Sequence, residues 1–139
     1  MNSRGMRKKM TVLVDSWAWI EYFKGTASGE KVKELIENSQ DKVIVSAVNI
    51  AEVYNLFLRD YSHPDNKRYA ETSRKAMKQR SYVYEVDEEI AVDSAKIKHE
   101  KKWGLGDSMI YATAKREGAK VLTGDPHFRG LKDVIFLER

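Results

Sequence analysis

Residues 104–128 read GLGDSMIYATAKREGAKVLTGDPHF and contain two acids, Asp107 and Asp125. The residues after Asp107 leave few polar positions, which predicts a helix, and Gly118 is the usual residue to end a helix in a left-handed conformation. Residues Lys120–Thr123 then form a short apolar run flanked by Gly, which predicts a buried strand. Asp125 follows this strand almost directly. The stretch therefore predicts a helix, a turn, a strand and an acid, in that order.

A strand followed by an acid also begins the chain. Residues Thr11–Val14 form a continuous apolar run, typical of a strand covered on both faces, and Asp15 follows it. Strand patterns at 42–45, 81–86 and 134–137 alternate with helical patterns at 16–25, 28–39, 47–61, 65–80 and 87–102. This alternation predicts an α/β fold, a single three-layer α/β/α domain with a central, mostly parallel sheet. Ligands of such sheets bind beyond the carboxyl ends of the strands, where these acids are expected.

Composition narrows the class of protein. The 139 residues suffice for one domain with its own core, and no apolar run is long enough to cross a bilayer. The absence of Cys excludes disulfides and thiolate sites and favours a cytoplasmic location. The net charge of +4 favours a polyanionic partner, or it reflects solvated lysines alone. We interpret residues 1–10 as a basic arm or as upstream residues, and residues 11–139 as the domain.

Glu52 lies in the helix expected over 47–61. It points away from the main apolar stripe of this helix, as an ordinary exposed acid does. However, Val48 and Leu56 flank it on its own side, and a carboxylate in apolar surroundings needs a partner. We therefore interpret Glu52 as lining a cleft. A helix that is apolar on two sides can also pack on the sheet and on a second subunit, which predicts a homodimer.

Four acids thus lie at strand ends or in the helices that follow them: Asp15, Glu52, Asp107 and Asp125. If they converge without a counter-charge, they repel one another and raise their own pKa values, and a divalent cation removes that penalty. Carboxylates without Cys or paired His favour Mg²⁺ or Mn²⁺ over zinc. Each acid also has an ordinary interpretation, because Asp15 and Asp107 could be helix caps and Asp125 a turn residue.

The segments VDSWAWIEYF, SAVNIAEVYN, GLGDSMIYATA and VLTGDPHF resemble the four signature segments of PIN-domain ribonucleases, particularly the VapC-type toxins of prokaryotic toxin–antitoxin pairs. The resemblance implies that the metal-binding and catalytic acids are Asp15, Glu52, Asp107 and Asp125. It also implies that Ser16 and Thr123 support the site by hydrogen bonding. Asn49 either orients Glu52 or is a polar residue in the first turn of its helix.

The activity implied by the resemblance is Mg²⁺- or Mn²⁺-dependent endonucleolytic cleavage of RNA by a metal-activated water. The implied partners are an RNA substrate, a protein antitoxin and a second copy of the chain. One alternative is a non-catalytic RNA-binding or regulatory PIN-like module, which would lack one or more of the four acids. Another is a phosphoacceptor receiver domain, but its pair of acids after the first strand is missing, since Ser16 follows the lone Asp15.

Overall fold

A single sheet of parallel strands forms the centre of the molecule. The computed structural model describes residues 8–60 and 64–138, and the sheet within them has five strands in the order β3-β2-β1-β4-β5. All four pairings between neighbours are parallel, for example with Leu13 opposite Ile44 and Val121. The strands are β1 (Thr11–Val14), β2 (Lys42–Ser46), β3 (Tyr82–Tyr84), β4 (Lys120–Thr123) and β5 (Val134–Phe136).

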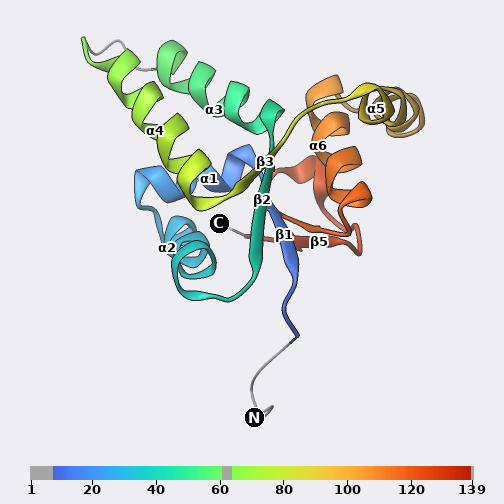
Figure 1. Cartoon of the computed structure of the whole chain (residues 1–139), viewed down its shortest axis with the longest axis horizontal. Coiled ribbons are helices and arrows are strands. Elements are labelled where there is room, and N and C mark those ends of the chain that lie inside the picture. Colours follow the sequence, from blue (N-terminus) through green and yellow to red (C-terminus); the bar gives the residue numbers. More distant parts are fainter. Residues whose placement is uncertain (1–7, 61–63, 139) are drawn as a thin grey trace.

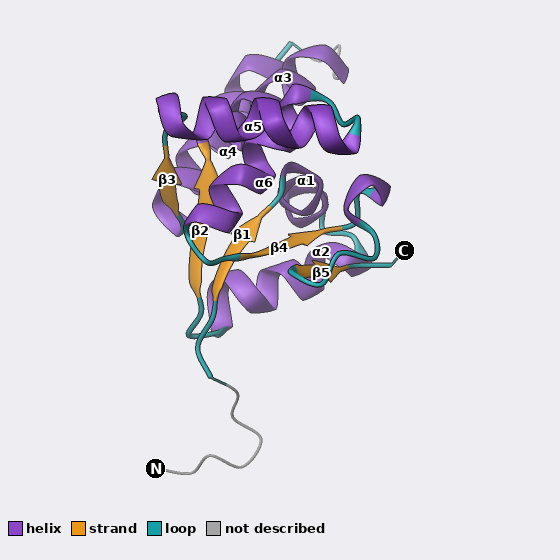
Figure 2. Cartoon of the chain, turned by 90° about the vertical axis from the view of Figure 1, so that its right-hand side faces the viewer, coloured by secondary structure: helices purple, strands orange, loops and turns teal. Residues whose placement is uncertain are grey.

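Helices cover both faces of this sheet, so the predicted three-layer fold is confirmed. One layer contains α1 (Ser16–Lys24), α2 (Ala27–Lys33) with its π-helical extension η1 (Glu34–Asn38), α3 (Ala47–Asp60) and α4 (Asn66–Arg80). The other contains α5 (Glu88–Lys101) and α6 (Leu105–Arg116), and the short 3₁₀ helix η2 (Pro126–Phe128) follows β4. Figure 1 shows the two helical layers on either side of the sheet, and Figure 2 views the sheet from the side of α5 and α6.

The sheet divides the hydrophobic core into two clusters, one on each of its faces. Successive side chains of a strand point to opposite faces. Val12 and Val14 therefore pack in one cluster with Trp19 of α1, while Leu13 packs in a second cluster with Ile110 of α6. All five of these side chains are fully buried.

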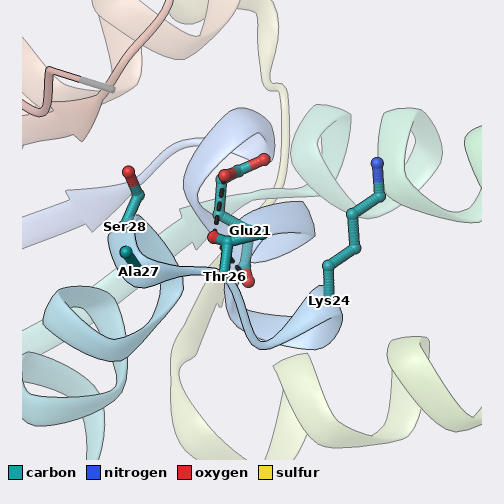
Figure 3. Close-up of a pocket in the computed structure, with 5 residues that line it drawn as sticks. All are labelled: Glu21, Lys24, Thr26, Ala27 and Ser28. Atoms are coloured by element: carbon teal, nitrogen blue, oxygen red, sulfur yellow. Dashed lines mark hydrogen bonds between the residues drawn. The ribbon is translucent and has the colours of Figure 1, made fainter.

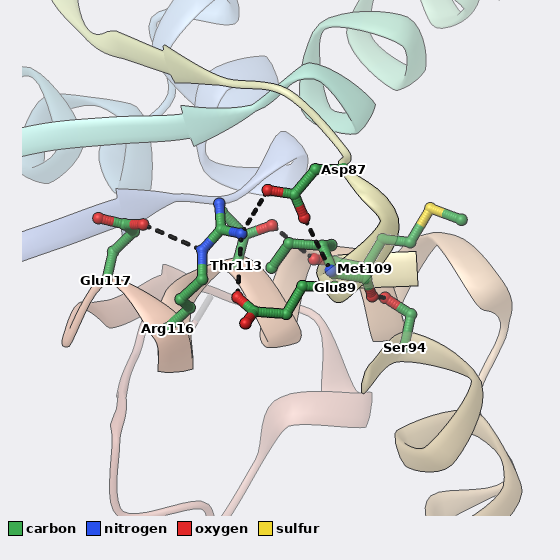
Figure 4. Close-up of polar contacts among 8 residues, drawn as sticks. Asp87, Glu89, Ser94, Met109, Thr113, Arg116 and Glu117 are labelled. Atoms are coloured by element: carbon green, nitrogen blue, oxygen red, sulfur yellow. Dashed lines mark hydrogen bonds and ion pairs between the residues drawn. The ribbon is translucent and has the colours of Figure 1, made fainter. Parts of the chain in front are cut away.

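An ion-pair network holds α6 against α5. The guanidinium of Arg116 donates hydrogen bonds to Asp87, at 2.7 Å, and to Glu89 and Glu117, at 3.3 and 3.2 Å (Figure 4). The Asp87 carboxylate also caps α5, because it accepts a hydrogen bond of 2.9 Å from the backbone N–H of Ile90. This network adds to the contacts between α5 and α6, the helix that carries Asp107.

Some predicted boundaries differ from those observed. The strand expected over 81–86 is confined to Tyr82–Tyr84, because the chain must then reach the start of α5 at Glu88. The helix expected over 28–39 begins one residue earlier and changes to π geometry in its second half. The helix expected over 47–61 is observed as far as Asp60, and its last expected residue, Tyr61, lies outside the described residues. Across the described part of the chain, no helix has the length and apolar character that a membrane crossing requires.

Candidate metal site

The four predicted acids lie at the carboxyl ends of the central strands or in the helices that begin there. Asp15 directly follows β1, and Asp125 comes two residues after Thr123, the last residue of β4. Since β1 and β4 are hydrogen-bonded neighbours, these two acids lie at the same edge of the sheet. Glu52 lies in α3, which begins directly after β2, and Asp107 lies in the first turn of α6.

Asp15 is the most deeply buried of the four, with only 3% of its surface exposed. Its Oδ2 accepts a hydrogen bond of 2.7 Å from Thr123 Oγ1, and its Oδ1 accepts one of 3.3 Å from Asn49 Nδ2. Burial raises the pKa of Asp15 to about 7, the bond from Thr123 opposes this rise, and the charge of Glu52 adds to it. Asp15 occupies the N-cap position of α1, yet its side chain makes no capping hydrogen bond. The carboxylate is therefore directed to the site and not to the helix end.

Glu52 is held by a short relay of polar side chains. Ser16 Oγ donates a hydrogen bond of 2.5 Å to Glu52 Oε1, and Asn49 Nδ2 donates one of 3.0 Å to Ser16 Oγ. Burial raises the pKa of Glu52, the bond from Ser16 opposes the rise, and the charge of Asp125 adds to it. Asn49 thus touches Asp15 directly and reaches Glu52 only through Ser16.

The backbone of α6 approaches Glu52 closely at Gly106. A Cβ atom at this position would lie 3.0 Å from Glu52 Oε2 and 3.7 Å from Val48 Cγ1. A larger residue would therefore displace the carboxylate. Gly106 is a site residue that the sequence did not single out, because the requirement comes from the contact between α3 and α6.

Asp107 and Asp125 lie close enough together to share one metal ion. Together with His127 they offer three ligand atoms that all lie within 4.8 Å of one another. Burial raises the pKa of Asp107 to about 6, the charges of Asp125 and Glu52 add to the rise, and His127 opposes it. Asp107 is not the cap of α6, since Gly104 takes that position. Asp125 stabilises the turn that follows it, as expected for a turn residue, because its Oδ1 accepts a hydrogen bond of 3.0 Å from the backbone N–H of His127.

His127 is the candidate ligand that sequence reasoning missed. Its Nδ1 lies 2.9 Å from Asp125 Oδ1 and 3.2 Å from Asp107 Oδ2, so it bridges the two acids. One sequence pattern could have indicated His127. In the Asp-Pro-His turn after β4, the histidine is two residues after Asp125, and its ring folds back toward the aspartate.

The donor set fits a divalent cation. Three of the four acids have raised pKa values that burial and the neighbouring charges explain, and a bound cation would stabilise their ionised forms. Carboxylate oxygens suit Mg²⁺ and Mn²⁺, whereas an imidazole nitrogen favours transition ions such as Mn²⁺ over Mg²⁺. The geometry therefore supports a site for one of these ions, with Asp107, Asp125 and His127 nearest one another.

A further buried acid, Glu21, lies outside this cluster. It lines a pocket at the junction of α1 and α2 with Lys24 and Thr26 (Figure 3). Thr26 Oγ1 donates a hydrogen bond of 2.8 Å to Glu21 Oε1 and accepts one of 3.0 Å from the Gly29 N–H. Since Thr26 is the N-cap of α2, these bonds give the buried Glu21 carboxylate a structural role at the junction of α1 and α2.

An all-parallel sheet with helices on both faces and a polar site at its carboxyl edge defines the class of α/β ligand-binding domains. Within that class, residues 12–134 match the family model of the PIN domain, and the chain belongs to this family. No curated protein sequence matches the chain.

Solved structures with a similar fold include several toxins. A toxin–antitoxin complex from Klebsiella pneumoniae matches with a TM-score of 0.71 and 22% identity, over 90% of this chain and 96% of that one. VapC20 from Mycobacterium tuberculosis, described as a sarcin–ricin loop cleaving toxin, matches with a TM-score of 0.68 and 20% identity, over 89% and 98%. VapBC2 from Rickettsia felis, bound to a promoter DNA fragment, matches with a TM-score of 0.68 and 14% identity, over 92% and 98%. At these identities the likeness establishes the fold.

Proposed function

We propose that the protein is a divalent-metal-dependent endoribonuclease and the toxin of a type II toxin–antitoxin pair. The observation that carries this proposal is the gathering of Asp107, Asp125 and Glu52 at the carboxyl edge, where burial, and then the charges of neighbouring carboxylates, raise the pKa values of Asp107 and Glu52. Membership of the PIN family supports the nuclease class. The RNA-cleaving toxin among the structural neighbours supports RNA as the substrate.

In this proposal Asp15, Glu52, Asp107 and Asp125 are the catalytic and metal-binding acids, and His127 joins them. When bound, Mg²⁺ or Mn²⁺ supplies a water of lowered pKa and positive charge beside the phosphodiester. Thr123 fixes one oxygen of Asp15 and also accepts the backbone N–H of Asp125 at 2.9 Å, so a single hydroxyl sets the relative positions of two acids. Ser16 orients Glu52 in the same way.

The proposed partners are an antitoxin that covers the acids and a second copy of the chain. A structural neighbour described as a toxin–antitoxin complex supports the antitoxin. An exposed apolar side chain on α3 supports the homodimer, since Leu58 exposes 42% of its surface although Val53, on the same helix, is fully buried. We place this pair in the cytoplasm. Sedimentation that finds only monomer at high concentration would contradict the dimer.

A cleavage assay tests the nuclease. Labelled single-stranded RNA is incubated with the antitoxin-free protein and Mg²⁺ or Mn²⁺, with EDTA, and with the variant Asp107→Asn. We expect cutting that both EDTA and the substitution abolish. The matched control Glu85→Gln, an exposed acid in the loop after β3, retains full activity. If folded protein binds several RNAs, including tRNA, and cuts none with either metal, the non-catalytic RNA-binding module replaces the nuclease.

A further inference from the structure

A groove of about 800 Å³ lies at the amino ends of the strands. It is bounded by the start of β2 at Lys42, the end of α4 at Arg80 and the start of β3 at Tyr82. The acids lie at the opposite, carboxyl edge of the same sheet. In Figure 1 the amino end of β2 lies at the foot of the sheet, and its carboxyl end leads upward into α3. The groove is therefore separate from the candidate metal site.

The lining of this groove is strongly basic. It includes the cations Lys9, Lys42, Lys78 and Arg80, and all four are exposed. The one carboxylate in the lining, Asp41, accepts a hydrogen bond of 2.9 Å from the backbone N–H of Met10. These cations come from the N-terminal segment, β2 and α4, so the fold gathers them from three distant parts of the sequence. A surface of this kind attracts polyanions.

An aromatic side chain completes the groove. Tyr82 lies on the edge strand β3 and exposes 64% of its surface. Lys42 Nζ lies 5.0 Å from the centre of the Tyr82 ring and 5.9 Å from that of Tyr84. The ammonium also donates a hydrogen bond of 3.3 Å to the Tyr84 hydroxyl, so it is held over one face of the exposed Tyr82 ring. Cations next to an open aromatic ring are what proteins use to bind single-stranded nucleic acids, through phosphates and stacked bases.

We propose that this groove is a second RNA-binding surface, in which Lys9, Lys42, Lys78 and Arg80 contact phosphates and Tyr82 stacks on a base. The choice of RNA rests on the proposed function. An acidic protein segment would satisfy the lysines, but it would leave the exposed ring without a role. The groove thus holds a segment of substrate remote from the bond that is cut.

The size of the sheet sets which RNAs can use the groove. The five residues of β2 span about 15 Å between the two edges. A dinucleotide at the acids therefore does not reach the groove, whereas a longer strand contacts both. The groove raises the affinity for long RNA and leaves the cleavage of a dinucleotide unaffected.

Binding without metal tests the groove independently of catalysis. We would follow fluorescence anisotropy of a labelled oligoribonucleotide in EDTA, with circular dichroism to confirm folding. Tyr82→Ala should weaken binding about fivefold or more, the lower range of base stacking, while Tyr82→Phe keeps the ring and the affinity. Unchanged affinity in the Tyr82→Ala variant would overturn the stacking role.

Double charge-reversal variants distinguish RNA binding in the groove from non-specific electrostatic attraction to the whole protein surface. Lys42→Glu with Lys78→Glu should weaken binding and reduce the salt slope by about 0.7 for each phosphate that the protein no longer neutralises. The control, Lys67→Glu with Lys132→Glu, makes the same change at two exposed lysines outside the groove lining. Equal losses of affinity in the two double variants would overturn the proposal. Binding of polyglutamate as tight as that of RNA would instead assign the groove to an acidic protein.

Cleavage assays then distinguish the two proposals. In the groove variants, the KM for long RNA should rise and the cleavage rate of a diribonucleotide should stay at the wild-type value. A protein that cuts no RNA refutes the proposed nuclease, yet the anisotropy measurements still decide whether the groove binds RNA. Equal effects of the groove variants on long and short substrates would show that the groove does not act through the length of the RNA.

Discussion

Ser16 and Glu52, separated by 36 positions in the sequence, are joined by a 2.5 Å hydrogen bond from the serine hydroxyl to Oε1 of the carboxylate. The bond connects the first turn of α1 to α3. Ser16→Ala would leave Glu52 without this donor and raise its pKa further, because the bond favours the ionised form. We expect slower cleavage and a pH–rate profile whose acidic limb moves to higher pH. Ser94→Ala removes a comparable hydroxyl, bonded to the Ile90 carbonyl, and should leave the profile unchanged.

Thr123 supports two acids at once, so its hydroxyl should matter more than its volume. Thr123→Val keeps the shape and removes the bonds to Asp15 Oδ2 and from the Asp125 N–H. We expect a decrease of about 1–3 kcal/mol in the free energy of unfolding, together with a large decrease in cleavage. The matched control is Thr113→Val. Thr113 is fully buried and donates a hydrogen bond of 2.8 Å to the Met109 carbonyl (Figure 4), and this bond involves none of the four acids. If both variants lose activity equally, the positioning role of Thr123 is wrong.

The raised pKa values make the metal-free protein less stable at higher pH. Asp15 and Asp107 have pKa values of about 7 and about 6 in the folded chain, against an ordinary value of 3.8. The folded state therefore binds protons more tightly than the unfolded state. This contribution to stability is fully present below about pH 4 and is lost as pH rises through 6 to 7. Denaturant unfolding in EDTA should show this decline, and Asp15→Asn should flatten it. If the free energy of unfolding in EDTA instead rises between about pH 4 and pH 7, and Asp15→Asn removes that rise, the pKa of Asp15 is not raised in the folded protein.

Gly124 is required by the ring that packs on it. A Cβ atom at this position would lie 2.4 Å from Trp17 Cζ2, so Gly124→Ala must displace the indole or the backbone that leads to Asp125. We expect a marked decrease in both stability and cleavage. Gly104→Ala adds the same methyl group in open space, at the N-cap of α6, and should cost less than about 1 kcal/mol. Thermal unfolding and RNA cleavage of the two variants would be compared directly.

The order of elements and the positions of the acids could be predicted because both depend on local patterns. The strand expected at Lys120–Thr123 is observed at these residues, and Gly118 adopts the expected left-handed conformation with φ of +64°. Apolar runs mark buried strands, and an acid after such a run must lie at the carboxyl edge of a parallel sheet. The expectation for Glu52 came from its two apolar neighbours, and the chain places it beside Ser16 and Gly106.

The contacts that complete the site could not be predicted, because they join distant segments. His127 reaches Asp107 only when η2 packs beside the start of α6. Asn49 was expected either to orient Glu52 or to be an ordinary helix residue, but its amide bridges Asp15 and Ser16. Its Oδ1 also accepts the Ser46 N–H at 2.9 Å. Such partners depend on the relative positions of α1, α3 and β4, which no local pattern encodes.

Electron paramagnetic resonance of bound Mn²⁺ can determine whether the acids at the carboxyl edge form one divalent-cation site. We expect the protein to bind Mn²⁺ and Mg²⁺ to compete. Asp107→Asn and Asp125→Asn should abolish binding, His127→Ala should weaken binding of Mn²⁺ more than that of Mg²⁺, and Glu85→Gln should have no effect. If folded wild-type protein binds no Mn²⁺, or if the Asp107→Asn variant binds it as tightly as the wild type, the acids do not form this cation site.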